Sequence, residues 1–182
     1  MRIFAVTSLL LLYAGSLLLA QDGFQKPVWG SERARLAFLA GKFTTETHIS
    51  ANPMSPNGST GKGTSSITWA VDSMFLMLDD QSLDKLMGQY KAHGMLGYDP
   101  RDGKYILSMF NNFGEETNYR GTLSGDTLIL RSKVEFPGGS FDQKLVWYKD
   151  GRNLGLKLFN DMGNGPVQFL EQIATPVTAG KK

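Results

Sequence analysis

Cysteine is absent from the 182 residues, and histidine occurs only twice, as His48 and His93. Without cysteine the chain cannot be a disulfide-stapled mini-protein, and no lipid can be attached to a cysteine after its apolar N-terminus. Structural zinc sites draw mainly on cysteine and on clustered histidine, whereas these two histidines lie on separate predicted strands. We therefore expect no metal and no cofactor.

An excess of charge of one sign is also missing. The chain has 19 lysines and arginines against 17 aspartates and glutamates, for a formal net charge of +2. Because a nucleic-acid-binding surface needs a concentrated basic face, we expect no nucleic-acid partner. A hydrophobic content of 41% in a chain of this length indicates one folded domain rather than a disordered chain.

Recognisable catalytic motifs are missing as well. No G-x-S-x-G nucleophile elbow occurs, and residues 58–64 only superficially resemble a phosphate-binding loop, because Pro56 and Gly63 occupy two positions that the motif requires as other residues. The acidic residues form two groups, in predicted turns where solvation explains them: Asp79, Asp80 and Asp84, then Glu115 and Glu116. We therefore predict no catalytic residue.

What the chain does have at its start is an uncharged run, residues 3–20, preceded by Arg2. A short basic start, an apolar stretch and a small residue at Ala20 are typical of a secretory signal peptide. We expect residues 1–20 to be this signal peptide and residues 21–30 to be an N-terminal extension. The alternative is an uncleaved membrane anchor. Both interpretations place the domain outside the cytoplasmic membrane, in the periplasm or the extracellular space.

Glycine is abundant, with 21 residues spread between short apolar runs, and this spacing is typical of strands joined by tight turns. One short helix is predicted from Ser31, as its cap, to Gly41, and residues 52–63 are predicted to be a loop. The predicted strands are residues 42–50, 64–71, 73–78, 87–98, 104–111, 117–123, 127–135, 141–149, 153–161 and 166–174.

Successive short strands of this kind predict an antiparallel meander, and a meander of this size commonly closes into a barrel. We therefore predict an all-β fold: an antiparallel up-and-down, lipocalin-like β-barrel of about eight to ten strands with a short N-terminal helix. The barrel domain is expected over residues 31–176, and residues 177–182 are expected to form a polar tail. A two-sheet sandwich is the alternative architecture.

Several short motifs resemble those of a known family. The clearest is Gly-Tyr-Asp at residues 97–99, followed across a turn by Lys104 and Tyr105; Tyr119, Gly121 and Glu171 follow in the same order. Over residues 32–176 the chain is similar to a bacterial lipocalin-like (calycin-type) family of unknown function, number fifteen seventy-nine. The resemblance implies a lipocalin-like barrel, and it implies no activity, since the family has none assigned.

The chain also departs from the family pattern. Asn111 stands where members tend to have the aspartate of Trp-x-Asp, and Ala174 replaces the tyrosine of a final Glu-x-x-Tyr. Related nitrobindin-type barrels hold haem iron through a histidine, but neither His48 nor His93 matches their ligand region. The resemblance therefore supports the barrel fold, and it says little about which polar side chains line the barrel interior.

We expect a non-catalytic barrel that binds a small, mainly apolar ligand. Seven of the eight methionines follow residue 20 and could furnish an adaptable apolar cavity. One alternative is an enzyme that acts on a bound small molecule through Tyr105, Arg120 and Glu171; another is a ligand-free interaction module of the cell envelope. The residues predicted to line the barrel or its mouth are Tyr98, Tyr105, Asn111, Tyr119, Arg120, Lys144, Trp147, Glu171 and Gln172.

Overall fold

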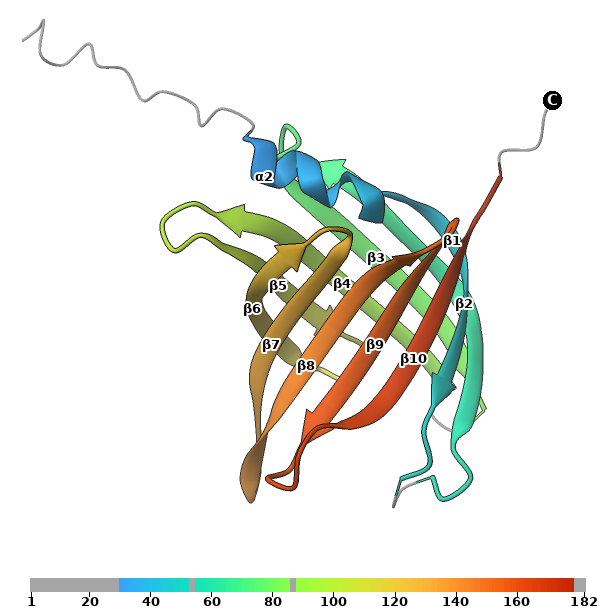
Figure 1. Cartoon of the computed structure of the whole chain (residues 1–182). Coiled ribbons are helices and arrows are strands. Elements are labelled where there is room, and N and C mark those ends of the chain that lie inside the picture. The colour runs from blue at the N-terminus through green and yellow to red at the C-terminus, as the bar shows by residue number, and fades with distance from the viewer. Residues whose placement is uncertain (1–29, 53–54, 86–87, 179–182) are drawn as a thin grey trace, which may run out of the picture.

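The chain folds into a closed barrel of ten antiparallel strands (Figure 1). The structure is a computed structural model, and it describes residues 30–52, 55–85 and 88–178. Consecutive strands pair with one another, and β1 closes the barrel by pairing with β10. The predicted up-and-down barrel is confirmed. The strands are β1 (Gly41–Ile49), β2 (Ser59–Ala70), β3 (Phe75–Asp84), β4 (Gly88–Asp99), β5 (Lys104–Asn111), β6 (Glu116–Ser124), β7 (Thr127–Phe136), β8 (Gly139–Asp150), β9 (Asn153–Asp161) and β10 (Val167–Pro176).

Parts of the predicted domain plan fall outside the described residues. These parts are the predicted signal peptide, residues 1–20, residues 21–29 of the N-terminal extension, and residues 179–182 of the tail. Among the residues that are described, no helix is both long enough and apolar enough to cross a membrane.

A short helical segment closes one end of the barrel (Figure 1). It consists of α2 (Ser31–Ala34) and a 3₁₀ turn, η1 (Arg35–Leu39). The N-cap residue is Gly30, so the predicted capping role of Ser31 is wrong. The Tyr105 hydroxyl fastens the segment to the barrel by donating to the backbone carbonyl and the carboxylate of Glu32, both at 2.9 Å. We call this end the helix end and the opposite end the distal end.

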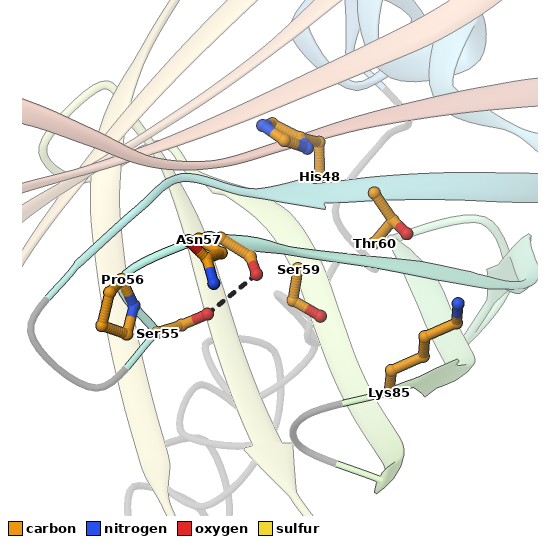
Figure 2. Close-up of a pocket in the computed structure, with 8 residues that line it drawn as sticks. His48, Ser55, Pro56, Asn57, Ser59, Thr60 and Lys85 are labelled. Carbon is orange, nitrogen blue, oxygen red and sulfur yellow. Dashed lines mark hydrogen bonds between the residues drawn. The ribbon is translucent and has the colours of Figure 1, made fainter.

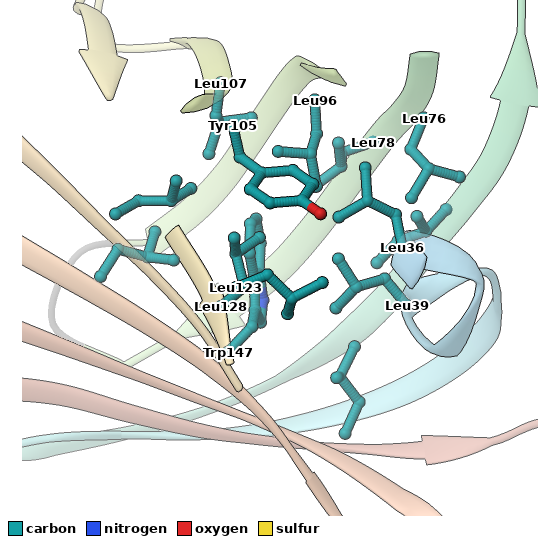
Figure 3. Close-up of a cluster of buried hydrophobic side chains, with 14 of the residues drawn as sticks. Leu36, Leu39, Leu76, Leu78, Leu96, Tyr105, Leu107, Leu123, Leu128 and Trp147 are labelled. Carbon is teal, nitrogen blue, oxygen red and sulfur yellow. The ribbon is translucent and has the colours of Figure 1, made fainter. Parts of the chain in front are cut away.

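The hydrophobic core fills the half of the barrel next to the helix. Leu36 and Leu39 point from the helical segment into a cluster that includes Tyr105 and Trp147 (Figure 3). Burying each leucine contributes about 1.5–3 kcal/mol. The other buried members of the cluster are Phe43, Ile67, Leu76, Leu78, Leu96, Leu107, Tyr119, Leu123, Leu128, Leu130, Leu145, Leu154 and Ala174.

Two strands reach further toward the distal end than the sequence predicts. β2 begins at Ser59, inside the predicted loop 52–63, and β3 continues to Asp84, past the predicted end at Leu78. Both extensions are paired on each side, because β2 lies between β1 and β3 while β3 lies between β2 and β4. Pairing of this kind outweighs the weak strand preference of glycine and aspartate. The prediction that Asp79, Asp80 and Asp84 lie in a turn is therefore wrong.

The family-like Gly-Tyr-Asp motif has a structural role in the turn between β4 and β5. The Asp99 carboxylate accepts hydrogen bonds from Arg101, from the backbone N and Nε at 3.0 Å and from Nη2 at 2.9 Å. Tyr98 and Tyr105, which are opposite each other in the register, pack with ring centroids 5.2 Å apart. The hydrogen bonds from the Arg101 side chain, followed by that from its backbone, lower the pKa of Asp99 to about 2.

We expect Asp99→Asn to make the barrel less stable near neutral pH and less sensitive to acid. The pKa of Asp99 falls from 3.8 to about 2 on folding. The ionised carboxylate therefore contributes its full stabilisation of the fold at pH values above the ordinary pKa of 3.8. This stabilisation is lost as the pH falls through that interval. Urea unfolding across the acid range should show a shallower decline for the variant, and Asp126→Asn, in an exposed turn, is the control. Equal declines for wild type and Asp99→Asn would contradict the prediction.

Candidate functional site

The interior of the barrel changes character along its axis. Alternate residues of each strand face inward. Near the helix end these residues are mostly apolar, and Leu76, Leu96, Leu128 and Leu130 are all 0% exposed. Toward the distal end the inward-facing side chains are mostly polar and remain partly exposed, among them Thr47, Ser82, Tyr90, Asn111, Thr117, Ser132, Gln143, Asn160 and Gln172. Because these side chains point into the barrel, their exposure means that solvent enters the distal half of the interior.

Hydrogen bonds join several of these polar side chains across the strands. The Tyr119 hydroxyl donates to Gln143 Oε1, and Gln143 Nε2 donates to Asn160 Oδ1 at 3.0 Å. Burial is the main cause that raises the pKa of Tyr119 above its ordinary value, so its hydroxyl keeps its proton at neutral pH. Gln172 Nε2 on β10 donates to Thr47 Oγ1 on the neighbouring strand β1 at 3.2 Å. The distal half is thus lined by oriented amides and hydroxyls.

Asp80 is the most unusual member of this lining. Its Oδ1 atom is buried and has no hydrogen-bond partner, and burial, more than the neighbouring charge of Asp79, raises the pKa of its carboxyl group. In the register Asp80 lies opposite Ser65 on β2 and Ala92 on β4, and the Ser65 side chain is a hydrogen-bond partner that partly offsets this rise. Thr45 Oγ1 on β1 is also buried without a partner. We call Thr45, Ser65 and Asp80 the Asp80 cluster.

The neighbours of the Asp80 cluster are small or uncharged. Ala92 is directly opposite Asp80, and Gly63 and Gly94 occupy the next inward positions of the flanking strands. In the distal half of the described strands, the inward-facing positions hold no lysine, arginine or histidine, and the only carboxylates there are Asp80 and Asp84. Lys149, which shares the inward face of β8, lies at the helix end. Ser59 donates a hydrogen bond to Asp84 at 2.5 Å. The charge that the distal half of the interior carries is therefore acidic.

Both histidines lie on the outer face of the barrel. His48 is exposed on β1, and His93 on β4 is half exposed, with its Nδ1 atom 2.8 Å from Asp79 Oδ1. Neither residue points to the interior. In the part of the chain that the structure describes, no group of three or more histidine, aspartate or glutamate side chains is placed to hold a metal ion.

The structure separates the residues that the sequence singled out. Tyr98, Tyr105, Tyr119 and Trp147 face inward in the core or against it, and the Tyr119 hydroxyl reaches Gln143. Asn111 and Gln172 face inward toward the distal half. The other three residues lie on the outer face, where Arg120 pairs with Asp102, Lys144 lies over the Phe159 ring and Glu171 pairs with Lys157. The convergence of Tyr105, Arg120 and Glu171 expected for an enzyme is not formed. As ligand contacts, all of these residues remain predictions.

Two hollows on the surface are less suited to a specific ligand. One, of about 510 Å³, is at the distal edge of β1 and β2 and is lined by His48, Ser59, Thr60 and Lys85 among others (Figure 2). The other, of about 500 Å³, lies over β7 to β9 between Arg131, Lys144 and Phe159. Neither is lined by the buried, unpartnered side-chain atoms that are found at the Asp80 cluster.

Sequence reasoning missed the Asp80 cluster because it ended β3 at Leu78. The signal was present as alternation, since Leu76, Leu78, Asp80, Ser82 and Asp84 continue one face of the same strand. Because Asp80, Ser82 and Asp84 are polar, the sequence does not indicate that the inward face of β3 continues through them.

Comparison with known proteins places the chain by fold and by family. A solved structure titled "Crystal Structure of Rv2717c from M. tuberculosis" matches 83% of this chain and 100% of its own length, with a TM-score of 0.61 and 16% sequence identity. At that identity the likeness is one of fold. No curated protein sequence matches the chain significantly. The family described as "Protein of unknown function (DUF1579)" matches residues 29–155, which is more than half of the chain. The predicted family is thus confirmed, and the chain belongs to the DUF1579 family of proteins of unknown function.

Proposed function

We propose that the barrel binds a small ligand in the distal half of its interior. The observation that carries the proposal is the solvent exposure of inward-facing polar side chains there, in contrast to the sealed core half. The unpartnered Asp80 Oδ1 and Thr45 Oγ1 atoms support it, because a buried polar atom without a partner costs about 1–3 kcal/mol. A ligand that donates hydrogen bonds would remove this cost on binding.

The ligand in this proposal is mainly apolar, with a polar group at one end. Met109, Leu156 and Leu158 face inward, pack against the core and remain partly exposed, so they offer an apolar wall above the filled half. The polar group would lie at the Asp80 cluster. We propose that the protein binds this ligand without chemical conversion, and that it does so outside the cytoplasm after export through residues 1–20.

The proposal predicts that Ala92→Leu weakens binding by about tenfold or more. Ala92 is 7% exposed and faces inward beside Asp80, so a larger side chain there would occupy the space that the ligand needs. Binding is measured by fluorescence titration with the neutral probe N-phenyl-1-naphthylamine, using Trp69 and Trp147 as internal reporters.

His93→Ala is the matched control, because His93 is adjacent in the sequence and lies on the outer face. Circular dichroism would first confirm that both variants fold. If the wild-type barrel binds neither the probe nor any molecule from a lipid extract in native mass spectrometry, the ligand-binding proposal fails and a ligand-free module is favoured. If wild type and Ala92→Leu bind the probe equally well, the proposed position of the binding site beside Ala92 is wrong.

A further inference from the structure

The inward-facing positions in the distal half of the described strands carry acidic side chains and no basic ones. We infer that this part of the interior selects a cationic ligand, a small apolar molecule that ends in a protonated amine. This inference rests on the proposed ligand-binding function and names the chemical class of its ligand. Its starting point is the free hydrogen-bonding capacity of Asp80, whose Oδ1 atom is buried without a partner.

The charges that face the interior favour a cation. Lysine, arginine and histidine are missing from the inward-facing positions of the described strands in the distal half, and Lys149 shares the inward face of β8 only at the helix end, so no positive side chain faces Asp80 there. Asp84 is further along the same face of β3, where it accepts a hydrogen bond from Ser59 at 2.5 Å. A carboxylate ligand would add negative charge beside these groups, whereas an ammonium group would compensate the charge of Asp80.

The titratable groups around Asp80 offer no alternative partner. β2 places Ser65 opposite it, and β4 contributes Tyr90, whose pKa is raised by burial and then by the charge of Asp80 itself. Asp79, on the outer face, is paired with His93 at 2.8 Å. The neighbouring charge that acts on the Asp80 carboxyl group is that of Asp79, which is acidic, so a ligand cation would supply the partner that Asp80 Oδ1 lacks.

The hydrogen-bonding groups of the Asp80 cluster are also of the kind that an ammonium group needs. An ammonium has three N–H donors, and the Asp80 cluster offers acceptors from three adjacent strands: Thr45 Oγ1, the Ser65 hydroxyl and Asp80 Oδ1. Tyr90 occupies the next inward position of β4 and packs against Phe113, with ring centroids 6.0 Å apart. Tyr90 is therefore one inward position further toward the distal end than Asp80, and an aromatic ring also attracts a cation.

The test compares three probes with the same alkyl chain: hexylamine, hexanol and hexanoate, each displacing N-phenyl-1-naphthylamine from the full-length protein. Near neutral pH we expect hexylamine to bind about tenfold more tightly than hexanol, and hexanoate to bind most weakly. Asp80→Asn should reduce hexylamine affinity about tenfold, to the level of hexanol, and should change hexanol affinity far less, because the amide oxygen still accepts a hydrogen bond from a neutral hydroxyl. Asp79→Asn, one residue away on the outer face, should change neither.

A second measurement needs no variant. Hexylamine stays protonated as the pH is lowered, whereas the Asp80 carboxyl becomes neutral, so hexylamine affinity should fall with acid while hexanol affinity stays level. If all three probes displace the dye equally in the wild type, or hexanoate displaces it best, the cation inference is wrong and ligand binding still stands. If neither the dye nor any molecule from a lipid extract binds to the wild type, the proposed function fails first.

Discussion

Gly121→Ala is expected to destabilise the barrel by about 3 kcal/mol, and to lower its melting temperature by about 6–12 °C. Gly121 is on β6 opposite Leu130 of β7. A Cβ atom added there would lie 1.8 Å from the backbone oxygen of Ile129 and 2.8 Å from Leu130 Cα. Because the clash is with backbone atoms of the paired strand, it can be relieved only by separating β6 from β7 and weakening their hydrogen bonds.

A matched control for this substitution is Gly139→Ala at the start of β8. A Cβ there would meet only the end of the Phe136 ring, at 3.4 Å, and the position is exposed. We expect this control to change the free energy of unfolding by less than about 0.5 kcal/mol. Urea and thermal unfolding followed by circular dichroism would measure both variants. If Gly121→Ala unfolds at the same midpoint as the wild type, the close approach of β6 and β7 does not control stability.

The glycine at residue 121 also explains part of the family-like sequence pattern. Its match to the family was visible beside Tyr119, but a sequence cannot show how closely two strands approach. The structure supplies the reason, since Tyr119 points into the core while Gly121 permits the contact with β7. A similar restriction applies at Gly63, where a Cβ would lie 2.0 Å from Gln81 O. That glycine made β2 resemble a loop in the sequence, whereas in the barrel it allows β2 to pair closely with β3.

The predictable part of the fold is the part governed by local chemistry. The turn at residues 99–103 combines Asp99, Pro100 and Gly103, and the one at Gly151 combines aspartate with glycine; both were located correctly because these residues favour tight turns. The distal extensions of β2 and β3 were missed because partners far away in the sequence stabilise them. Closure of the barrel through β1 and β10 likewise depends on contacts between the two ends of the domain.

The candidate site was less predictable than the fold. Which side chains face inward follows from alternation only once the strand ends and the register are known. Arg120, Lys144 and Glu171 were therefore grouped with inward-facing residues although they lie on the outer face. Asp80 was missed for a different reason: aspartate is rarely buried without a partner, so the general rule placed it in solvent. Only the structure shows that β3 continues past Leu78 and carries Asp80 on its inward face.

Leu39→Ala is expected to destabilise the protein by about 2–5 kcal/mol while leaving ligand binding intact. Leu39 is 0% exposed at the end of η1, where it seals the helix end of the core together with Leu36. Its truncation removes buried apolar area and leaves a cavity that the surrounding leucines fill only in part. Ala37→Ser, at an exposed position of the same 3₁₀ turn, is the control and should have an effect of less than about 0.5 kcal/mol.

Measuring ligand binding by this variant tests whether the apolar core at the helix end is separate from the proposed binding site in the distal half. The Asp80 cluster lies toward the distal end, whereas Leu39 closes the helix end, so hexylamine affinity should stay within about threefold of the wild type. The new cavity would be next to the buried leucines of the core, and it should take up small apolar molecules such as benzene more strongly than the wild type does. If Leu39→Ala instead weakens hexylamine as strongly as Asp80→Asn does, the two halves share one binding space, and the separation of core from site is wrong.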